Sequence, residues 1–224
     1  MLQARIPETD EALQSAEVAL AYDQMQRHIR DHGWLREKIE LVRSLGVRAG
    51  HVLELGPGPG YFGLEWLRAA DTPQSRLTAL DLAEQMLALA QRNAQDYGLA
   101  ARCHYQLGNC EHMPFEAQGF DGVISHSSLH EWAQPQRVLA EIHRVLKPGA
   151  PFCIVDLRRD LSREAVAFMR TNIPMEMRKG FANSVRAAYT EAELSALLQD
   201  SPLAGATVQN LQLGLVASGH RAQP

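Results

Sequence analysis

Apolar and polar residues follow two periods along this chain, and each period predicts a type of element. Short apolar runs bounded by turn residues predict strands at 52–55, 76–81, 101–107, 120–125 and 151–157. Apolar residues that recur every three or four positions predict helices at 61–70, 83–97 and 135–146. Strands that alternate with helices of this length are typical of a parallel sheet with right-handed crossovers.

The first part of the chain, residues 8–46, is expected to be mostly helical. Leu35, Ile39 and Val42 fall at i, i+4 and i+7, which is the spacing of one helix face, and a turn at 46–50 follows. We therefore expect a helical extension in front of the alternating region.

The alternation changes again after Asp156. Residues 161–189 are expected to form additional helix and loop, and Thr190 with Glu193 forms a capping box that starts a helix. The last two apolar runs leave no room for a helix between them, so they should pair as antiparallel strands. We expect one domain over 1–224 with four parts: an extension or lid at 1–47, a core at 48–156, an insertion at 157–189, and a last helix with a strand hairpin at 190–224.

Composition and charge narrow the class of protein. The chain has 224 residues, 46% of them hydrophobic, which is enough for one sizeable core. No apolar run approaches the roughly 20 residues of a membrane helix, and the first residues carry no apolar signal segment. The formal net charge of −4 argues against a general nucleic-acid binder. Three scattered cysteines, expected to be free thiols, fit a cytoplasmic protein.

A metal site is not expected from the histidine spacing. His126 and His130 lie four residues apart, which would suit a metal on one helix face, but the only further ligand nearby is Glu131. The stretch follows a predicted strand and is expected to be a loop, so we expect no bound metal.

The glycine-rich segment after the first predicted strand carries the strongest chemical signal. Gly58, Gly60 and Gly63 spell the GxGxxG pattern of dinucleotide sites, with Asp81 near the usual ribose spacing. Read with Glu54, the same segment spells ExGxGxG. A carboxylate at that position would repel a pyrophosphate and would suit a ligand with a cationic end.

Further motifs decide between these two interpretations. The segments VLELGPGPG (52–60), LTALD (77–81) with EQM (84–86), LGNCEHMPF (107–115), FDGVISHSSLHEW (120–132) and VLAEIHRVLKPGA (138–150) follow one another in order and at matching spacing. This series resembles the class I S-adenosylmethionine-dependent methyltransferases over most of residues 50–157. It is similar to the small-molecule branch of that family, which includes quinone C-methylation enzymes.

The resemblance implies a fold and a cofactor. The fold is α/β, a Rossmann-like seven-stranded, mostly parallel sheet with the last strand antiparallel and helices on both faces. The cofactor is S-adenosyl-L-methionine, and the product is S-adenosyl-L-homocysteine. The cofactor-binding residues that it implies are Tyr22, Glu54, Gly56, Pro57, Gly58, Gly60, Asp81, Leu82, Met86, Gly108, Asn109, Cys110, Glu111 and His126.

Individual roles carry alternatives. Glu54 would hold the amino acid end of the cofactor, or would only brace the glycine loop. Asp81 would accept hydrogen bonds from both ribose hydroxyls, or would cap the helix that follows, and Met86 would border the adenine. Asn109 departs from the family, which usually has aspartate there; its side-chain oxygen can still accept a bond from the adenine amino group, without the charge.

The reaction implied by the resemblance needs little acid–base chemistry. A sulfonium is a good leaving group, so in-line positioning and exclusion of water can suffice. The candidates for a general base are His126, His130, Asp156 and Tyr22. For Asp156, the alternative is a cap or an ion pair with Arg158 or Arg159. The Asn-Pro-Pro-Tyr type of motif of amino-group methylases is absent from the sequence.

The acceptor is expected to be a small molecule bound by the added segments. Residues 21–25 would close over the cofactor as a lid, or would be an ordinary packing helix. Residues 157–189 combine apolar side chains with an excess of arginine and lysine, which favours an apolar acceptor with an anionic group, held by Arg158 or Arg178; a plain helical cover is the alternative. Other functions left open are an RNA or protein methyltransferase and a non-catalytic cofactor-binding protein. The oligomeric state, monomer or homodimer, is left open as well.

Overall fold

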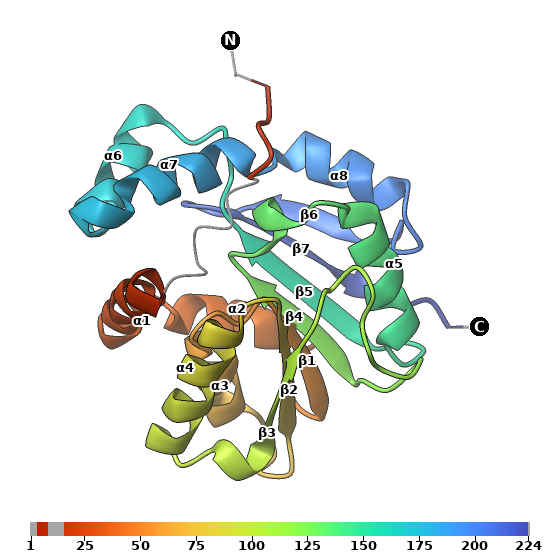
Figure 1. Cartoon of the computed structure of the whole chain (residues 1–224). Coiled ribbons are helices and arrows are strands. Elements are labelled where there is room, and N and C mark those ends of the chain that lie inside the picture. Colours follow the sequence, from red (N-terminus) through yellow and green to blue (C-terminus); the bar gives the residue numbers. More distant parts are fainter. Residues whose placement is uncertain (1–3, 9–15, 224) are drawn as a thin grey trace.

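The sheet lies at the centre of the molecule, and its strand order confirms the predicted fold class. A computed structural model describes residues 4–8 and 16–223, so residues 9–15 of the predicted extension lie outside the described residues. The sheet order is β3-β2-β1-β4-β5-β7-β6 (Figure 1). The strands are β1 His51–Leu55, β2 Arg76–Asp81, β3 Cys103–Leu107, β4 Gly122–His126, β5 Pro151–Asp156, β6 Thr207–Asn210 and β7 Leu215–His220.

The parallel direction of β1 to β5 places the carboxyl ends of these five strands at one edge of the sheet. Strands β1 to β5 pair in parallel, whereas β7 pairs antiparallel with both β5 and β6. The predicted hairpin at the end of the chain is therefore confirmed, with β7 inserted between β5 and β6. The order reverses beside β1, and crevices for ligands form at such a point, outside the carboxyl ends of the strands.

The two faces of the sheet carry two separate apolar clusters. Alternate residues of one strand point to opposite faces, so Leu53 joins the cluster under α5 and α8, whereas Val52 joins the cluster under α2 and α3. The helices are α1 Ala16–Asp31, α2 Arg36–Ser44, α3 Tyr61–Ala69, α4 Glu84–Asp96, α5 Pro135–Val145, α6 Arg163–Thr171, α7 Arg178–Ala187 and α8 Glu191–Gln199. Short 3-10 turns lie at η2 Ala100–Arg102, η3 Leu129–Glu131 and η4 Met175–Met177.

Most predicted boundaries agree with the structure to within two residues. The capping box of Thr190 and Glu193 is present, and Gly98 has the left-handed φ of +68° that suits a glycine after a helix. The predicted strand at 101–107 begins only at Cys103, because Ala100–Arg102 form the 3-10 turn η2. The side chain of Arg102 is fixed there by donating to the carbonyl of Ser75 at 2.9 Å.

The segment from 157 to 189, which we call the cap, lies beside the sheet and joins a core only at its end, where Tyr189 belongs to the cluster under α5 and α8. None of the α6 side chains is buried, and in α7 only Ala187 is. Figure 1 shows α6 and α7 above the carboxyl edge of the strands, on the same side as α1. The cap therefore depends on contacts across that edge for its position.

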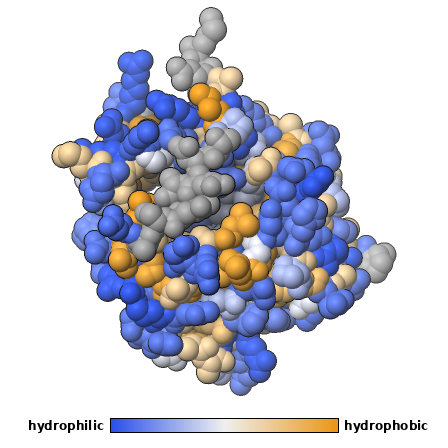
Figure 2. Space-filling view, in the orientation of Figure 1, coloured by the Kyte–Doolittle hydropathy of each residue, from blue (hydrophilic) through white to orange (hydrophobic). Residues whose placement is uncertain are grey.

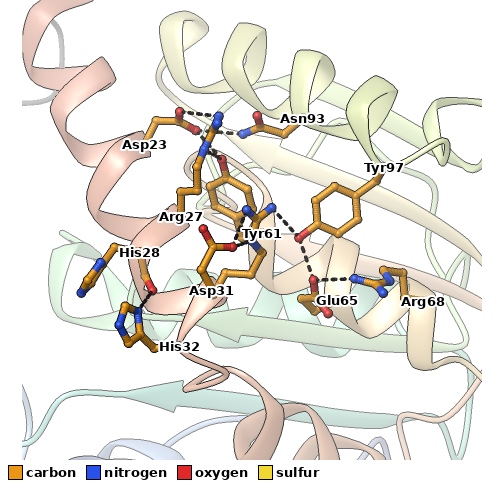
Figure 3. A network of polar contacts seen from close by, with 11 residues as sticks. Asp23, Arg27, His28, Asp31, His32, Tyr61, Glu65, Arg68, Asn93 and Tyr97 are labelled. Atoms are coloured by element: carbon orange, nitrogen blue, oxygen red, sulfur yellow. Dashed lines mark hydrogen bonds and ion pairs between the residues drawn. The ribbon is translucent and has the colours of Figure 1, made fainter.

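A buried aspartate fastens α1 to the core (Figure 3). Oδ1 of Asp23 accepts bonds from the hydroxyl of Tyr61 at 3.0 Å and from Nδ2 of Asn93 at 2.9 Å. Oδ2 lies 3.4 Å from Arg27 and 3.3 Å from Arg92. Asn93 also donates to the carbonyl of Pro59 at 2.9 Å. One carboxylate thus connects α1 with α3, α4 and the glycine loop.

A second buried carboxylate braces the start of α3. Glu54 is 1% exposed, and its Oε1 accepts from the backbone N–H of Gly63 at 3.0 Å. Its Oε2 is buried without a hydrogen-bond partner among the described residues. Burial disfavours the charged form and raises the pKa of Glu54 to about 8, although the bond from Gly63 acts in the opposite direction.

We expect Asp23→Ala to lower the free energy of unfolding by about 2–4 kcal/mol, because it leaves buried donors without their acceptor. Urea unfolding measures the loss, and hydrogen exchange should show faster exchange in α1. The control is Asp31→Ala, which removes an exposed pair with Arg30 and should cost less than about 0.5 kcal/mol. Equal losses in both variants would contradict a special role for Asp23.

We expect the stability of the wild type to fall as the pH rises from about 5 to 8.5, relative to Glu54→Gln. The raised pKa means that Glu54 keeps its proton in the folded state at pH values where the unfolded chain has already released it. The stability that this proton contributes is therefore complete below the pKa of Glu54 in the unfolded chain. It is lost as the pH rises through the pKa in the folded state. The difference should exceed about 1.4 kcal/mol, the value of one pKa unit. Thermal unfolding over this range measures it, with exposed Glu84→Gln as control; parallel curves for wild type and Glu54→Gln would show that Glu54 does not titrate this way.

Candidate functional site

A single large cleft opens at the carboxyl ends of β1, β2, β4 and β5. Its volume is about 1810 Å³, and α1, α2 and the cap supply its outer walls. Figure 2 shows apolar side chains gathered toward the middle of this face of the molecule, with hydrophilic side chains around its border. Most of the site residues expected from the sequence lie in this cleft.

The glycine loop after β1 forms the floor of the cleft. Gly56 and Gly58 line it, with left-handed φ angles of 63° and 53°. A Cβ on Gly56 would collide with the side chain of Ser128, and a Cβ on Gly58 would lie 3.3 Å from Tyr22. Glycine is required at Gly56 because both the backbone angle and the close packing exclude a side chain.

Three residues expected at the cofactor do not line the cleft. Glu54, Pro57 and Gly60 are not among the residues that line the cavity. Glu54 braces Gly63 instead, which is the alternative that the sequence left open. Gly63 packs against Glu54 and Leu77, so the GxGxxG interpretation does not describe the lining of this cleft.

Asp81 stands at the end of β2 with its carboxylate at the cleft. Its Oδ2 accepts from the backbone N–H of Gly58 at 3.1 Å and its Oδ1 from that of Ala83 at 2.9 Å. Each oxygen keeps a further lone pair for a ligand hydroxyl. Burial raises the pKa of this carboxyl. The N-cap of α4 is Ala83, so the interpretation of Asp81 as a helix cap is wrong.

The turn after β3 forms the next wall. Gly108, Asn109, Cys110 and Glu111 all line the cleft, opposite Leu82 and Met86. The side-chain oxygen of Asn109 accepts from the backbone N–H of Glu111 at 2.8 Å, which fixes the turn and leaves one lone pair. Leu82 is 68% exposed, an unusual position for a leucine, and burial raises the pKa of the Cys110 thiol to about 12. The wall therefore offers apolar surface and one amide.

Tyr22 closes the cleft from the side of α1. Its ring lies against the glycine loop, and burial raises the pKa of its hydroxyl far above the usual range. The neighbouring Asp23 fixes the helix that carries it. At this pKa Tyr22 holds its proton, so it can donate a hydrogen bond but does not supply a base.

His126 is held as a neutral imidazole. Its ring stacks on Phe62 with centroids 4.6 Å apart. Burial, together with the positive charge of Lys38, lowers the pKa of His126 to about 3. It lines the cleft at the end of β4, as expected, and can accept or donate a hydrogen bond without charge.

Asp156 and His130 form a buried pair at the end of β5. Oδ1 of Asp156 lies 2.7 Å from Nδ1 of His130, and Oδ2 accepts from the backbone N–H of His130 at 3.0 Å. Burial alone would lower the pKa of His130, but the charges of Asp156, Glu131 and Glu8 raise it to about 9. The ion pair expected as one alternative for Asp156 is wrong, because Arg158 pairs with Asp160, and Arg159 pairs with Glu193.

Sequence reasoning missed Glu8. Its side chain is 14% exposed, and its Oε2 lies 3.8 Å from Nε2 of His130. Glu131 approaches the same nitrogen, also at 3.8 Å. No motif marks Glu8, and 121 positions separate it from its nearest partner in the sequence. Only the fold brings the segment 4–8 to this place.

The cap gives the cleft a largely apolar outer wall. Its cleft-facing apolar residues are Leu157, Phe168, Met169, Ile173, Met177 and Phe181. The cations at this wall are lysines, Lys179 on the cap and Lys38 on α2. Arg158 and Arg178, the expected anion-binding residues, do not line the cleft; Arg178 donates to the carbonyl of Ile173 at 3.1 Å.

Two further observations bear on the class of protein. Within residues 4–8 and 16–223, none of the helices combines the length and the hydropathy needed to cross a bilayer. Residues 53–154 match the family model described as "Methyltransferase domain".

Several curated proteins are similar to the chain. It is 36% identical to the biotin biosynthesis bifunctional protein BioHC of Teredinibacter turnerae, over 53% of this chain and 22% of that protein. It is 32% identical to the demethylmenaquinone methyltransferase of Symbiobacterium thermophilum, over 65% of this chain and 58% of that protein. The chain thus spans less than two thirds of the length of these two relatives.

Longer matches occur at lower identity. The ubiquinone/menaquinone biosynthesis C-methyltransferase UbiE of Pseudomonas putida is 26% identical, over 98% of this chain and 92% of that protein. A solved structure from Methanococcus maripaludis, described as an S-adenosyl-L-methionine-dependent methyltransferase, has a TM-score of 0.70 at 20% identity and covers 98% of each chain. The family model, the relatives and the seven-stranded sheet together confirm the resemblance: residues 53–154 match a methyltransferase domain, and the chain is similar in sequence to quinone C-methyltransferases and in fold to the Methanococcus maripaludis structure.

Proposed function

We propose that the protein transfers a methyl group from S-adenosylmethionine to a small-molecule acceptor. The observation that carries the proposal is one continuous cleft with two chemically different ends. One end has the bare glycine loop, Asp81 and the 108–111 turn; the other has the apolar wall of the cap. A donor and an acceptor bound at these ends would meet near His126 and Tyr22.

The residues at the first end fit the cofactor. Gly56 and Gly58 line the cleft without side chains, so the backbone there can be approached closely by a ligand. The two carboxylate oxygens of Asp81 match the two donors of a ribose diol, and Leu82 and Met86 offer apolar surface to a purine. When bound there, the cofactor supplies a methyl group on a positively charged sulfur. Glu54 would act from behind, by holding Gly63 and so the loop.

The protein's part in the reaction would be positioning and exclusion of water. Tyr22 lies over the loop and is fixed by the Asp23 bonds of α1, so residues 21–25 would act as one wall of a closed chamber. Neutral His126 can orient a polar group of the acceptor. The buried pair of His130 and Asp156 is the candidate for proton transfer among the groups expected from the sequence.

The acceptor would be apolar and small enough to enter beneath the cap, residues 157–189. Six apolar side chains of the cap line the cleft, and Lys38 and Lys179 offer positive charge for an anionic or polar oxygen group. Quinol-like rings have this chemistry, as the names of the similar methyltransferases suggest. A long RNA or a folded protein fits poorly under the cap, which favours a small-molecule acceptor. We also propose a cytoplasmic location for the reaction.

We expect tight binding of S-adenosylhomocysteine and none of NADH in calorimetric titrations. Asp81→Ala should weaken binding at least tenfold, because both ribose hydroxyls lose their acceptor, whereas Asp96→Ala at the far end of α4 should leave it unchanged. Binding of NADH alone would overturn the proposal. Methyl-labelled cofactor with a panel of demethylated quinols then tests turnover; tight binding without transfer to any acceptor would favour the non-catalytic alternative.

We expect Gly56→Ala to abolish cofactor binding, whereas Gly98→Ala leaves it intact. Both glycines have similar left-handed angles, so both variants should lose about 1 kcal/mol of stability from backbone strain. Only Gly56 faces the Ser128 side chain, whereas the space beside Gly98 is open. Calorimetry with S-adenosylhomocysteine separates the two effects. Equal binding by both variants would show that the loop does not cradle the ligand.

A further inference from the structure

Three potential metal ligands converge on one point of the cleft. They are Glu8 from the segment 4–8, and His130 and Glu131 from η3. One ligand atom from each lies within 4.8 Å of the other two. Nε2 of His130 is 3.8 Å from a carboxylate oxygen of Glu8 and 3.8 Å from one of Glu131. These contacts lie beyond hydrogen-bond distance.

One buried atom at this point, on Glu8, has no hydrogen-bond partner among the described residues, and a nitrogen of His130 faces two carboxylates from beyond hydrogen-bond distance. The side chain of His130 is 4% exposed, and its Nε2 faces the two carboxylates without a hydrogen bond to either. Oε2 of Glu8 is buried and has no hydrogen-bond partner among the described residues. Such groups are costly to bury unless a further partner satisfies them. A cation among the three side chains would satisfy both.

The other nitrogen of His130 has the partner that metal-binding histidines usually have. Nδ1 lies 2.7 Å from Asp156, whose two oxygens also accept from the backbone N–H groups of His130 and Leu157. A metal ion that displaced the proton of Nε2 would leave the proton of Nδ1 on this carboxylate's side, with the lone pair of Nε2 directed at the ion between Glu8 and Glu131. This carboxylate–histidine arrangement orients the ring and makes it a better ligand.

The segment that carries Glu8 is fixed to the rest of the site. Arg5 donates to the carbonyl of His130 at 3.1 Å, and its guanidinium lies 4.1 Å from the centroid of the Tyr189 ring. The backbone N–H of Ile6 donates to the carbonyl of Arg186 at 3.2 Å. These contacts hold Glu8 over His130, so its carboxylate is not a freely moving surface group.

We propose that Glu8, His130 and Glu131 bind one divalent transition-metal ion, of the Mn²⁺ or Zn²⁺ class. One imidazole and two carboxylates suit these ions, and the two negative charges balance the charge of the ion. Bonds of about 2.0–2.2 Å place tetrahedral ligand atoms about 3.4 Å apart, so small movements of the two carboxylates complete the site. Water or an acceptor oxygen would take the remaining positions, on the side of the cleft.

The test uses the metal alone and does not depend on methyl transfer. Titration with Mn²⁺, followed by the paramagnetic resonance of the free ion, and with Zn²⁺ against a chromophoric chelator should give one site per chain. Glu8→Gln and Glu131→Gln should each weaken binding at least tenfold, and Asp156→Asn, which acts through His130, by about 10–100-fold. The control Glu176→Gln, a cleft carboxylate outside the cluster, should leave metal affinity unchanged.

Several outcomes would overturn the proposal. They are no stoichiometric binding by the wild type, equal affinity in Glu8→Gln, or a His130 ring protonated on both nitrogens in the presence of excess metal. The last would mean that an imidazolium ion balances the two carboxylates. Glu8→Gln lies in a surface segment and is the variant to use if Asp156→Asn fails to fold. Affinity for S-adenosylhomocysteine, measured in the same samples, tests the proposed function separately.

Discussion

Parallel pairing of β1 with β2 and with β4 is the constraint on which the rest of the structure depends. It brings the ends of β1, β2, β4 and β5 to one edge of the sheet, so that residues far apart in the sequence face one cleft. Gly56, Asp81, His126 and Asp156 each follow directly on such a strand or end it. The sheet itself is held from both faces by separate apolar clusters, so the edge is rigid where the ligands bind.

Charge is unevenly distributed across this cleft. Glu8, Glu131 and Asp156 gather beside η3, whereas Lys38 and Lys179 stand on α2 and the cap. Between them His126 stays neutral, because it is buried and because Lys38 disfavours a second positive charge nearby. Such a distribution of charge orients a bound molecule through the molecule's polar group. The apolar side chains between the acidic and the basic side contact the apolar part of that molecule.

The sequence predicts the sheet and the cofactor end of the cleft better than the acceptor end. Short-range patterns fix the strands, the glycine loop and Asp81, because the period of apolar residues and the glycine spacing are local properties of the chain. The direction in which Glu54 points is not determined by a local sequence pattern, because it follows from the packing of α3 on β1. The pairing of Arg158 with Asp160 competes with the anion-binding role expected of it. Glu8 belongs to no periodic element, so nothing but the folded chain could place it near His130.

The amide of Asn93 has a kinetic consequence. It donates simultaneously to Asp23 on α1 and to the carbonyl of Pro59 in the glycine loop. One side chain therefore connects the wall of the cleft with its floor. For a molecule bound under Tyr22 to leave by that side, α1 would have to lift, and lifting α1 would withdraw Asp23 from Tyr61 and Asn93 together. S-adenosylhomocysteine and new S-adenosylmethionine would then exchange no faster than this cluster of buried hydrogen bonds breaks. This exchange, rather than formation of the new bond to carbon, oxygen or nitrogen, would be a natural limit to the rate of turnover.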